Sequence, residues 1–119
     1  MRTLCLLAAA LMAIASAVSA QVADPRVCGA PLRDADGSIA RSSTAKAEFR
    51  RLHACPSTHR TTGACPGWEV DHVIPLACGG CDAVGNMQWL PAAIKRASGP
   101  LPKDRWERWV YCQTPSRVQ

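Results

Sequence analysis

The stretch that decides the fold covers residues 69–89 and reads EVDHVIPLACGGCDAVGNMQW. Its first part is rich in β-branched residues, which predicts a strand over residues 68–76. The pair Gly79-Gly80 follows, and glycine takes the positive φ angles of tight turns at little cost. A second short strand is expected over residues 87–90. The segment therefore predicts a β-hairpin.

Helical patterns flank the predicted hairpin on both sides in the sequence. Upstream, apolar residues recur at i, i+4 and i+7 and predict a short amphipathic helix over residues 42–53. The other face of this helix holds cations that form either a solvated surface or a phosphate-binding face: Lys46, Arg50 and Arg51. Downstream, residues 103–111 predict a final helix after a break rich in Gly and Pro. Together these elements indicate a small α+β domain with an additional N-terminal helix.

The length of the chain, 119 residues, fits one small domain. We expect an irregular N-terminal arm over residues 21–38, the domain itself over residues 39–112 and a C-terminal tail over residues 113–119. The formal net charge of +5 is compatible with a polyanionic partner, but no run of five or more cations occurs. Charge alone therefore does not establish nucleic-acid binding. We expect a monomer.

The first twenty residues, MRTLCLLAAALMAIASAVSA, predict a secretory signal peptide that is cleaved after Ala20. A membrane anchor would need about 20 apolar residues followed by charged flanks, whereas this apolar run is shorter and leads into small residues. A lipoprotein is disfavoured because Cys5 comes before the apolar core. The sequence thus predicts a secreted or periplasmic protein without stable membrane association after cleavage.

The number of cysteines also indicates an exported protein. Cleavage would remove Cys5 and leave six of the seven cysteines, and an even set in an exported protein indicates a disulfide framework. The favoured pair is Cys55 with Cys65, which would close a loop rich in Pro and Gly. The other four cysteines stay unassigned. For the Cys78-Gly79-Gly80-Cys81 step, a zinc site and a redox site are alternatives, although neither the second ligand pair nor the following helix that they need is present.

The candidate chemistry lies in the Asp71-His72 step and in Asn86, fourteen residues after the histidine. Phosphodiester hydrolysis needs a base that deprotonates water, a hard cation that takes up charge and a group that holds the base in position. Histidine suits the first task, because its ordinary pKa of about 6.5 leaves it mostly neutral at neutral pH. A neighbouring carboxylate suits Mg²⁺, which prefers oxygen ligands. Taken alone, the same residues would more often form a surface ion pair and a turn.

These residues, with the IPL and Gly-Gly steps between them and the NMQW run at 86–89, resemble the core of the HNH endonucleases, which have a ββα-metal fold. Further motifs, among them CPGW at 65–68 and KDRWE at 103–107, resemble an exported bacterial branch of that family. The resemblance implies that His72 is the general base and Asp71 a metal ligand. It also implies that Asn86 ties the turn to the strand and keeps the base oriented.

The third metal ligand departs from the family pattern. Standard members place a His or Asn on the following helix, but the matching window here is Ile94-Lys95-Arg96, and no His or Asn occurs over residues 87–119. We assign this role to Asp104, with Glu107 as the other acidic substitute. A geometric condition applies as well: neighbouring residues on a regular strand point to opposite faces, so the Asp-His step must lie at a bulge or a strand end.

The expected function is that of a metal-dependent endonuclease that hydrolyses phosphodiester bonds in nucleic acid, DNA before RNA. The expected cofactor is a divalent ion, Mg²⁺ first, with Mn²⁺ or Zn²⁺ as alternatives. Candidate contacts to the nucleic-acid backbone are Arg41, Arg50, Lys95, Lys103 and Arg105. Two other classes remain open: an HNH scaffold that binds nucleic acid or protein without cutting, and a disulfide-stapled structural protein without ligand.

Overall fold

The computed structural model describes residues 23–112. The predicted signal peptide and the C-terminal tail lie outside the described residues. Within that range, helix α1 covers Ser43–Leu52, strand β1 Trp68–His72, strand β2 Met87–Pro91, helix α2 Ala92–Lys95 and helix α3 Lys103–Tyr111. Two single 3-10 turns, η1 at Leu76–Cys78 and η2 at Val84–Asn86, lie in the connection between the strands. This is a small α+β structure, as the sequence predicts.

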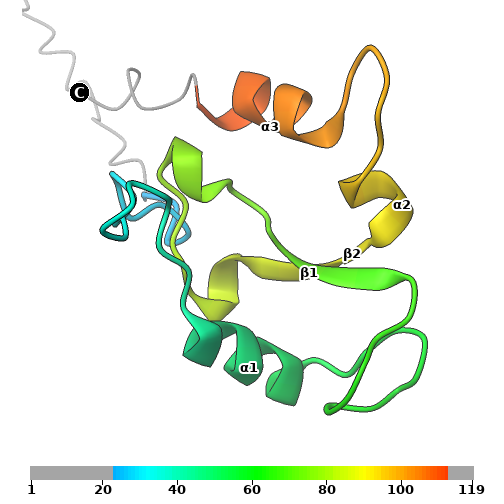
Figure 1. Cartoon of the computed structure of the whole chain (residues 1–119). Helices are drawn as coiled ribbons and strands as arrows, with labels where there is room; N and C mark the ends of the chain where they lie inside the picture. Colours follow the sequence, from blue (N-terminus) through cyan, green and yellow to red (C-terminus); the bar gives the residue numbers. More distant parts are fainter. Residues whose placement is uncertain (1–22, 113–119) are drawn as a thin grey trace, which may run out of the picture.

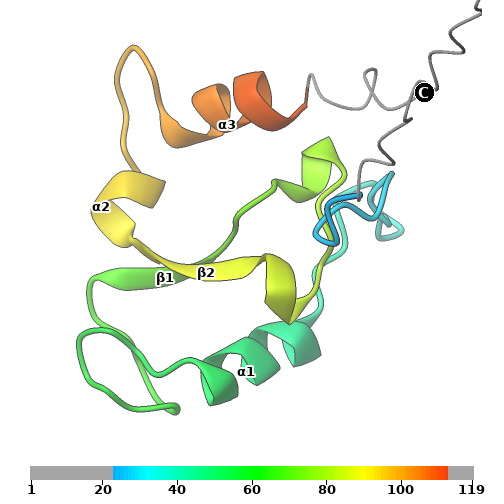
Figure 2. The same ribbon diagram turned by 180° about the vertical axis from the view of Figure 1, so that it is seen from behind.

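The two strands form one antiparallel sheet in which Trp68 pairs with Pro91 and His72 with Met87. Helix α1 lies on one side of this hairpin and helix α3 on the other, as both ribbon views show (Figures 1 and 2). Strand β1 therefore has one face toward α1 and one toward α3. Because side chains alternate along a strand, neighbouring residues of β1 meet different helices.

Helix α1 begins and packs as its sequence predicts. The Ser42 side chain accepts a hydrogen bond from the backbone N–H of Ala45, which satisfies one of the free donors at the helix start. Phe49 is only 2% exposed, and its ring lies 5.7 Å from the ring of Trp89 on β2. This contact fixes α1 against the hairpin and identifies the face of β2 that meets the helix.

Strand β1 ends at His72, four residues earlier than the predicted range of 68–76. The reason lies in Asn86. The Val73 N–H still donates to the backbone oxygen of Asn86, but the Asn86 N–H turns to the Ala83 carbonyl, and the next donor, the Ile74 N–H, bonds to the Asn86 side-chain oxygen. Gly80 packs directly against this bend. The residue there must be glycine, because a Cβ atom would sit 2.0 Å from the Ile74 carbonyl oxygen. The ladder therefore gives way to a compact loop directly after the Asp-His step.

Two disulfides, Cys28–Cys81 and Cys78–Cys112, join segments that are distant in the sequence, and a third, Cys55–Cys65, closes a local loop. The predicted use of cysteines in disulfides is thus confirmed, and the favoured Cys55–Cys65 pair is one of the three. Each bridge is expected to contribute about 2–4 kcal/mol by restricting the unfolded chain. This matters because the buried apolar set is small.

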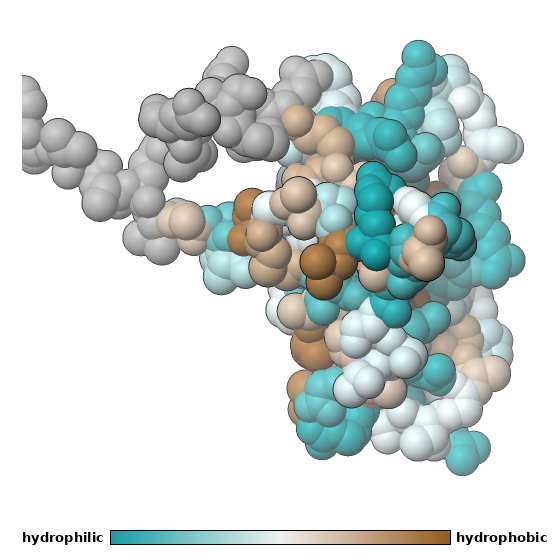
Figure 3. Space-filling model, turned by 60° about the vertical axis from the view of Figure 1, so that its left-hand side comes forward, coloured by the Kyte–Doolittle hydropathy of each residue, from teal (hydrophilic) through white to brown (hydrophobic). Residues whose placement is uncertain are grey.

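Figure 3 shows a face on which hydrophobic residues form small separate patches among hydrophilic ones. Among residues 23–112, no helix has the length and apolar character needed to cross a bilayer.

Candidate functional site

A cavity of about 590 Å³ lies at the end of β1, between the hairpin, helix α3 and the segment that precedes α1. Both members of the Asp71-His72 step line it, and so do Asp82 and residues of α3. The cations at its walls are Arg41, Lys46, Lys95, Lys103 and Arg108. The cavity thus joins an imidazole, carboxylates and an excess of positive charge, which is the environment that a phosphodiester needs.

His72 is held by a carboxylate that the sequence analysis does not single out. Its Nε2 atom lies 2.8 Å from Oδ1 of Asp82, and only 12% of its side chain is exposed. Since a carboxylate only accepts, Nε2 is the donor in this contact, and the tautomer that makes it has its lone pair on Nδ1. Within residues 23–112, Nδ1 has no hydrogen-bond partner. The pair therefore leaves one basic nitrogen available.

Asp82 is itself fixed in position. Its second carboxylate oxygen accepts a short hydrogen bond from the backbone N–H of Ser42, the residue that caps α1. One signal in the sequence would have found it: Asp82 is the only carboxylate between His72 and Asn86, and a histidine base is commonly oriented by an acidic partner. The start of α1, the loop and the histidine are therefore linked through one side chain.

Asp71 lies on the other face of β1 and has a different set of partners. The ammonium nitrogen of Lys103, on α3, lies 3.0 Å from each of its carboxylate oxygens. Lys95 Nζ lies 3.7 Å from Oδ1 of Asp71, and the Gln88 side chain donates to the same carboxylate at 3.3 Å. Asp71 is 6% exposed, so this is a buried carboxylate whose charge is balanced by lysine.

Glu107 is the second carboxylate at this lysine. Lys103 and Glu107 are four residues apart on α3 and form a close ion pair, because residues at i and i+4 share one face of a helix. Burial raises the pKa of Glu107, while the ion pair with Lys103 opposes that rise. Asp104, the residue assigned from the sequence, also lines the cavity but is exposed. The α3 carboxylate that shares a partner with Asp71 is therefore Glu107.

The donors at this site are carboxylates, the ligand type that suits a hard divalent ion. In the part of the chain that the structure describes, no group of three or more His, Cys, Asp or Glu side chains is placed to hold a metal. The carboxylates of Asp71 and Glu107 are the oxygen ligands that Mg²⁺ prefers, and they already share one cation, the ammonium of Lys103. A divalent ion thus fits the donor set if it displaces this ammonium.

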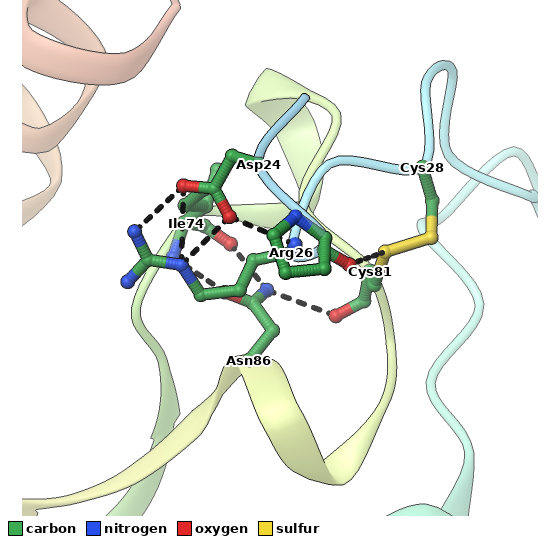
Figure 4. The surroundings of a disulfide bond; sticks show 7 residues. Asp24, Arg26, Cys28, Ile74, Cys81 and Asn86 are labelled. Atoms are coloured by element: carbon green, nitrogen blue, oxygen red, sulfur yellow. Dashed lines mark hydrogen bonds and ion pairs between the residues drawn. A yellow bond between two sulfur atoms is a disulfide. The ribbon is translucent and has the colours of Figure 1, made fainter. Parts of the chain in front are cut away.

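Asn86 organises the loop from within. It is completely buried, and its side chain points toward Ile74 and Cys81 (Figure 4). Its amide oxygen accepts from the Ile74 N–H, and its amide nitrogen donates to the carbonyls of Ile74 and Cys81, all at 2.9 Å. Asp82 follows Cys81 directly, so Asn86 acts on His72 through the loop that carries Asp82. No direct hydrogen bond joins it to the histidine among the described residues.

The cations expected to contact nucleic acid fall into three groups. Arg41 and Lys95 line the main cavity, and Lys103 does so as the buried partner of Asp71. Arg50 lines a second, smaller cavity. Arg105 lies on the exposed side of α3, where it donates to the Pro100 carbonyl. The structure therefore brings most, but not all, of this set to the same side as the candidate base.

The described residues thus form a small α+β domain with three disulfides, and a histidine–carboxylate pair lines a cavity that also contains cations. Comparisons with family models, with curated proteins and with solved structures each found no match to this chain.

Proposed function

We propose that the protein is a metal-dependent endonuclease of the ββα-metal, HNH class, with DNA as its preferred substrate. The observation that carries the proposal is the His72–Asp82 pair, which leaves a basic Nδ1 in a cavity lined by five cations. The order of elements, two strands followed by helical segments, supports this class. The base and the charged walls are the parts that phosphodiester hydrolysis requires.

In this mechanism Nδ1 of His72 accepts a proton from a water molecule as its oxygen attacks the phosphorus. The bond to the leaving oxygen breaks, and that oxygen takes a proton from solvent or from a protonated group. Asp82 stabilises the imidazolium and holds the ring in the required tautomer. Arg41, Lys46 and Lys95 bind the phosphate oxygens, since these cations line the same cavity.

Asp71 and Glu107 are the residues that would hold the divalent ion, Mg²⁺ by preference, and Mn²⁺ or Zn²⁺ as alternatives. When bound, the ion would neutralise charge that develops on the phosphate. The Lys103 ammonium contacts both carboxylates and would have to move aside. Asp104 remains close enough to the cavity to contribute through water.

The test is cleavage of plasmid DNA and of single-stranded DNA by the purified protein in buffer with Mg²⁺ or Mn²⁺. His72→Ala is expected to lower the rate by about 10²–10⁴-fold, the usual contribution of a general base. His59→Asn is the matched control, because His59 is exposed in a loop at φ 58°, a conformation that asparagine tolerates. Cleavage by the His72 variant at the rate of the unsubstituted protein would contradict the proposal.

A second function is favoured by one specific observation, the ammonium of Lys103 between two buried carboxylates. If this lysine permanently takes the place of the ion, the domain binds nucleic acid without cutting it. Calorimetry with Mg²⁺ and Mn²⁺ separates the two functions, because the endonuclease is expected to bind an ion and the binding module none.

We also propose that the protein works in the periplasm or outside the cell. Its three disulfides in a small domain support this, because such bridges persist in oxidising compartments.

A further inference from the structure

We infer that the protein binds an unpaired nucleotide beside the scissile phosphate, with its base stacked on Trp68. This inference rests on the proposed nuclease function and names the form of the substrate, single-stranded nucleic acid. It starts from a second cavity, of about 200 Å³, which shares Lys46, Val70 and Lys95 with the main cavity. The two cavities therefore lie next to each other along strand β1.

The strand itself connects the two positions. Trp68, Val70 and His72 occupy alternate positions of β1, so their side chains lie on the same face. Four residues at about 3.3 Å each separate the tryptophan from the histidine by about 13 Å. This span exceeds one nucleotide, so a base on Trp68 belongs to a neighbour of the nucleotide that is cut.

The charges of the second cavity suit a sugar-phosphate backbone. Lys46 and Arg50 lie one turn apart on α1 and line the cavity from the helix side. Its one carboxylate, Glu69, is already paired with Arg96 and lies 3.8 Å from Lys95. Positive charge therefore remains for a phosphate between Lys46 and the shared Lys95.

Of the two tryptophans in this cavity, Trp68 is the one available for stacking. The ring of Trp89 packs against Phe49, and its Nε1 atom donates to the His53 carbonyl at 3.0 Å. Trp68 has no ring contact of this kind among residues 23–112 and is half-buried at the cavity wall. A half-buried tryptophan in the wall of a cavity lined by cations suits the binding of single strands, because bases stack on aromatic rings.

Stacking on Trp68 selects against an intact duplex. A paired base is stacked between its neighbours, and moving it onto a protein side chain costs unpairing and unstacking energy. An unpaired base needs no such step. The substrate class is therefore a single strand, or an unpaired segment in a duplex.

The test uses protein with His72→Ala, so that binding is measured without cleavage. Fluorescence anisotropy compares a short single-stranded oligonucleotide with a duplex of the same sequence and length, and the single strand is expected to bind more tightly. Adding Trp68→Leu is expected to weaken single-strand binding by about tenfold, a typical loss for one stacking side chain, whereas Trp68→Phe retains most of it. Trp109→Ala is the control, since Trp109 is 72% exposed on α3 and lines neither cavity.

Equal binding of single strand and duplex, or unchanged binding by the Trp68→Leu variant, would overturn the inference. A second measurement covers the case in which that variant does not fold. In the His72→Ala protein with all tryptophans present, the indole NMR signal of Trp68 is expected to shift when the single strand is added, and a Trp68 signal that stays in place would also overturn it. Failure of the nuclease proposal looks different: the unsubstituted protein would then bind the oligonucleotide without cutting it.

Discussion

Two neighbouring residues of β1 show how differently one short strand can place two side chains. On the face toward α1, His72 has one partner, Asp82, and keeps a free ring nitrogen. On the face toward α3, Asp71 is surrounded by donors, with Lys103 in contact with both of its oxygens. In the proposed mechanism the histidine side serves proton transfer, whereas on the aspartate side the Lys103 ammonium already lies where a metal ion would bind.

The contrast separates two tasks that the sequence places side by side. In the proposed mechanism, activation of water depends on the loop that carries Asp82, and binding of a cation depends on helix α3. Each part is tied down by its own disulfide: Cys28–Cys81 beside Asp82, and Cys78–Cys112 at the end of α3. Changes on one side are therefore expected to leave the other side largely intact.

The largest effect is expected from Lys103→Met. This change keeps the length of the side chain but leaves two buried carboxylates without their cation, which typically destabilises a protein by about 3–5 kcal/mol. Added Mg²⁺ is expected to restore much of this stability and to bind more tightly than in the unsubstituted protein. Thermal unfolding with and without Mg²⁺ measures both effects, and Arg105→Met, on the exposed side of α3, is the control. If the melting temperature of the Lys103→Met variant does not change when Mg²⁺ is added, these carboxylates bind no ion.

Removal of single disulfides comes next. Replacing both cysteines of the Cys78–Cys112 pair by serine is expected to lower the free energy of unfolding by about 2–4 kcal/mol and to weaken Mg²⁺ binding, because α3 loses its tether. The same change at Cys28–Cys81 is expected to lower stability similarly but to affect the cleavage rate through Asp82. Urea unfolding, Mg²⁺ titration and cleavage assays of the two variants test this prediction. It is contradicted if both variants lose Mg²⁺ binding, or if both lose cleavage activity, to the same extent.

A smaller effect on rate is expected from Asp82→Asn. The amide still fills the space, but it stabilises the imidazolium less well and loosens the choice of tautomer. Partners of this kind typically contribute about 10–100-fold. Steady-state kinetics should show a lower kcat with little change in KM, and Asp36→Asn, in the exposed arm, should change neither. An unchanged kcat would mean that Asp82 does not support the base.

The secondary structure and the Asp-His step could be predicted from the sequence, but the side chains that contact Asp71 and His72 could not. The hairpin, the helix over 103–111 and the Asp-His step follow from local patterns. Strand β1 is shorter than predicted because the Asn86 side chain accepts from the Ile74 N–H, an interaction over twelve residues that β propensity does not reveal. Glu107, rather than Asp104, meets Asp71 through Lys103 because the orientation of α3 depends on tertiary packing.

The smallest effect is expected from Asp24→Asn, which touches neither side of β1. Hydrogen bonds from Arg26 lower the pKa of the Asp24 carboxyl to about 2. A lowered pKa means that the ionised group favours the folded state above its ordinary value, and that this contribution is lost as the pH falls toward 2. Melting curves of the two proteins should therefore differ slightly at neutral pH and converge near pH 2. A gap that widens in acid would contradict this assignment.

The central claim is that Asp82 holds His72 with the proton on Nε2, so that Nδ1 can accept a proton from water. Long-range ¹⁵N–¹H NMR of the histidine rings at neutral pH tests it most directly, with His72→Ala identifying the signal. The account predicts a protonated Nε2 and an unprotonated Nδ1 for His72. The opposite tautomer would contradict it, because Nδ1 would then have no lone pair with which to act as the base.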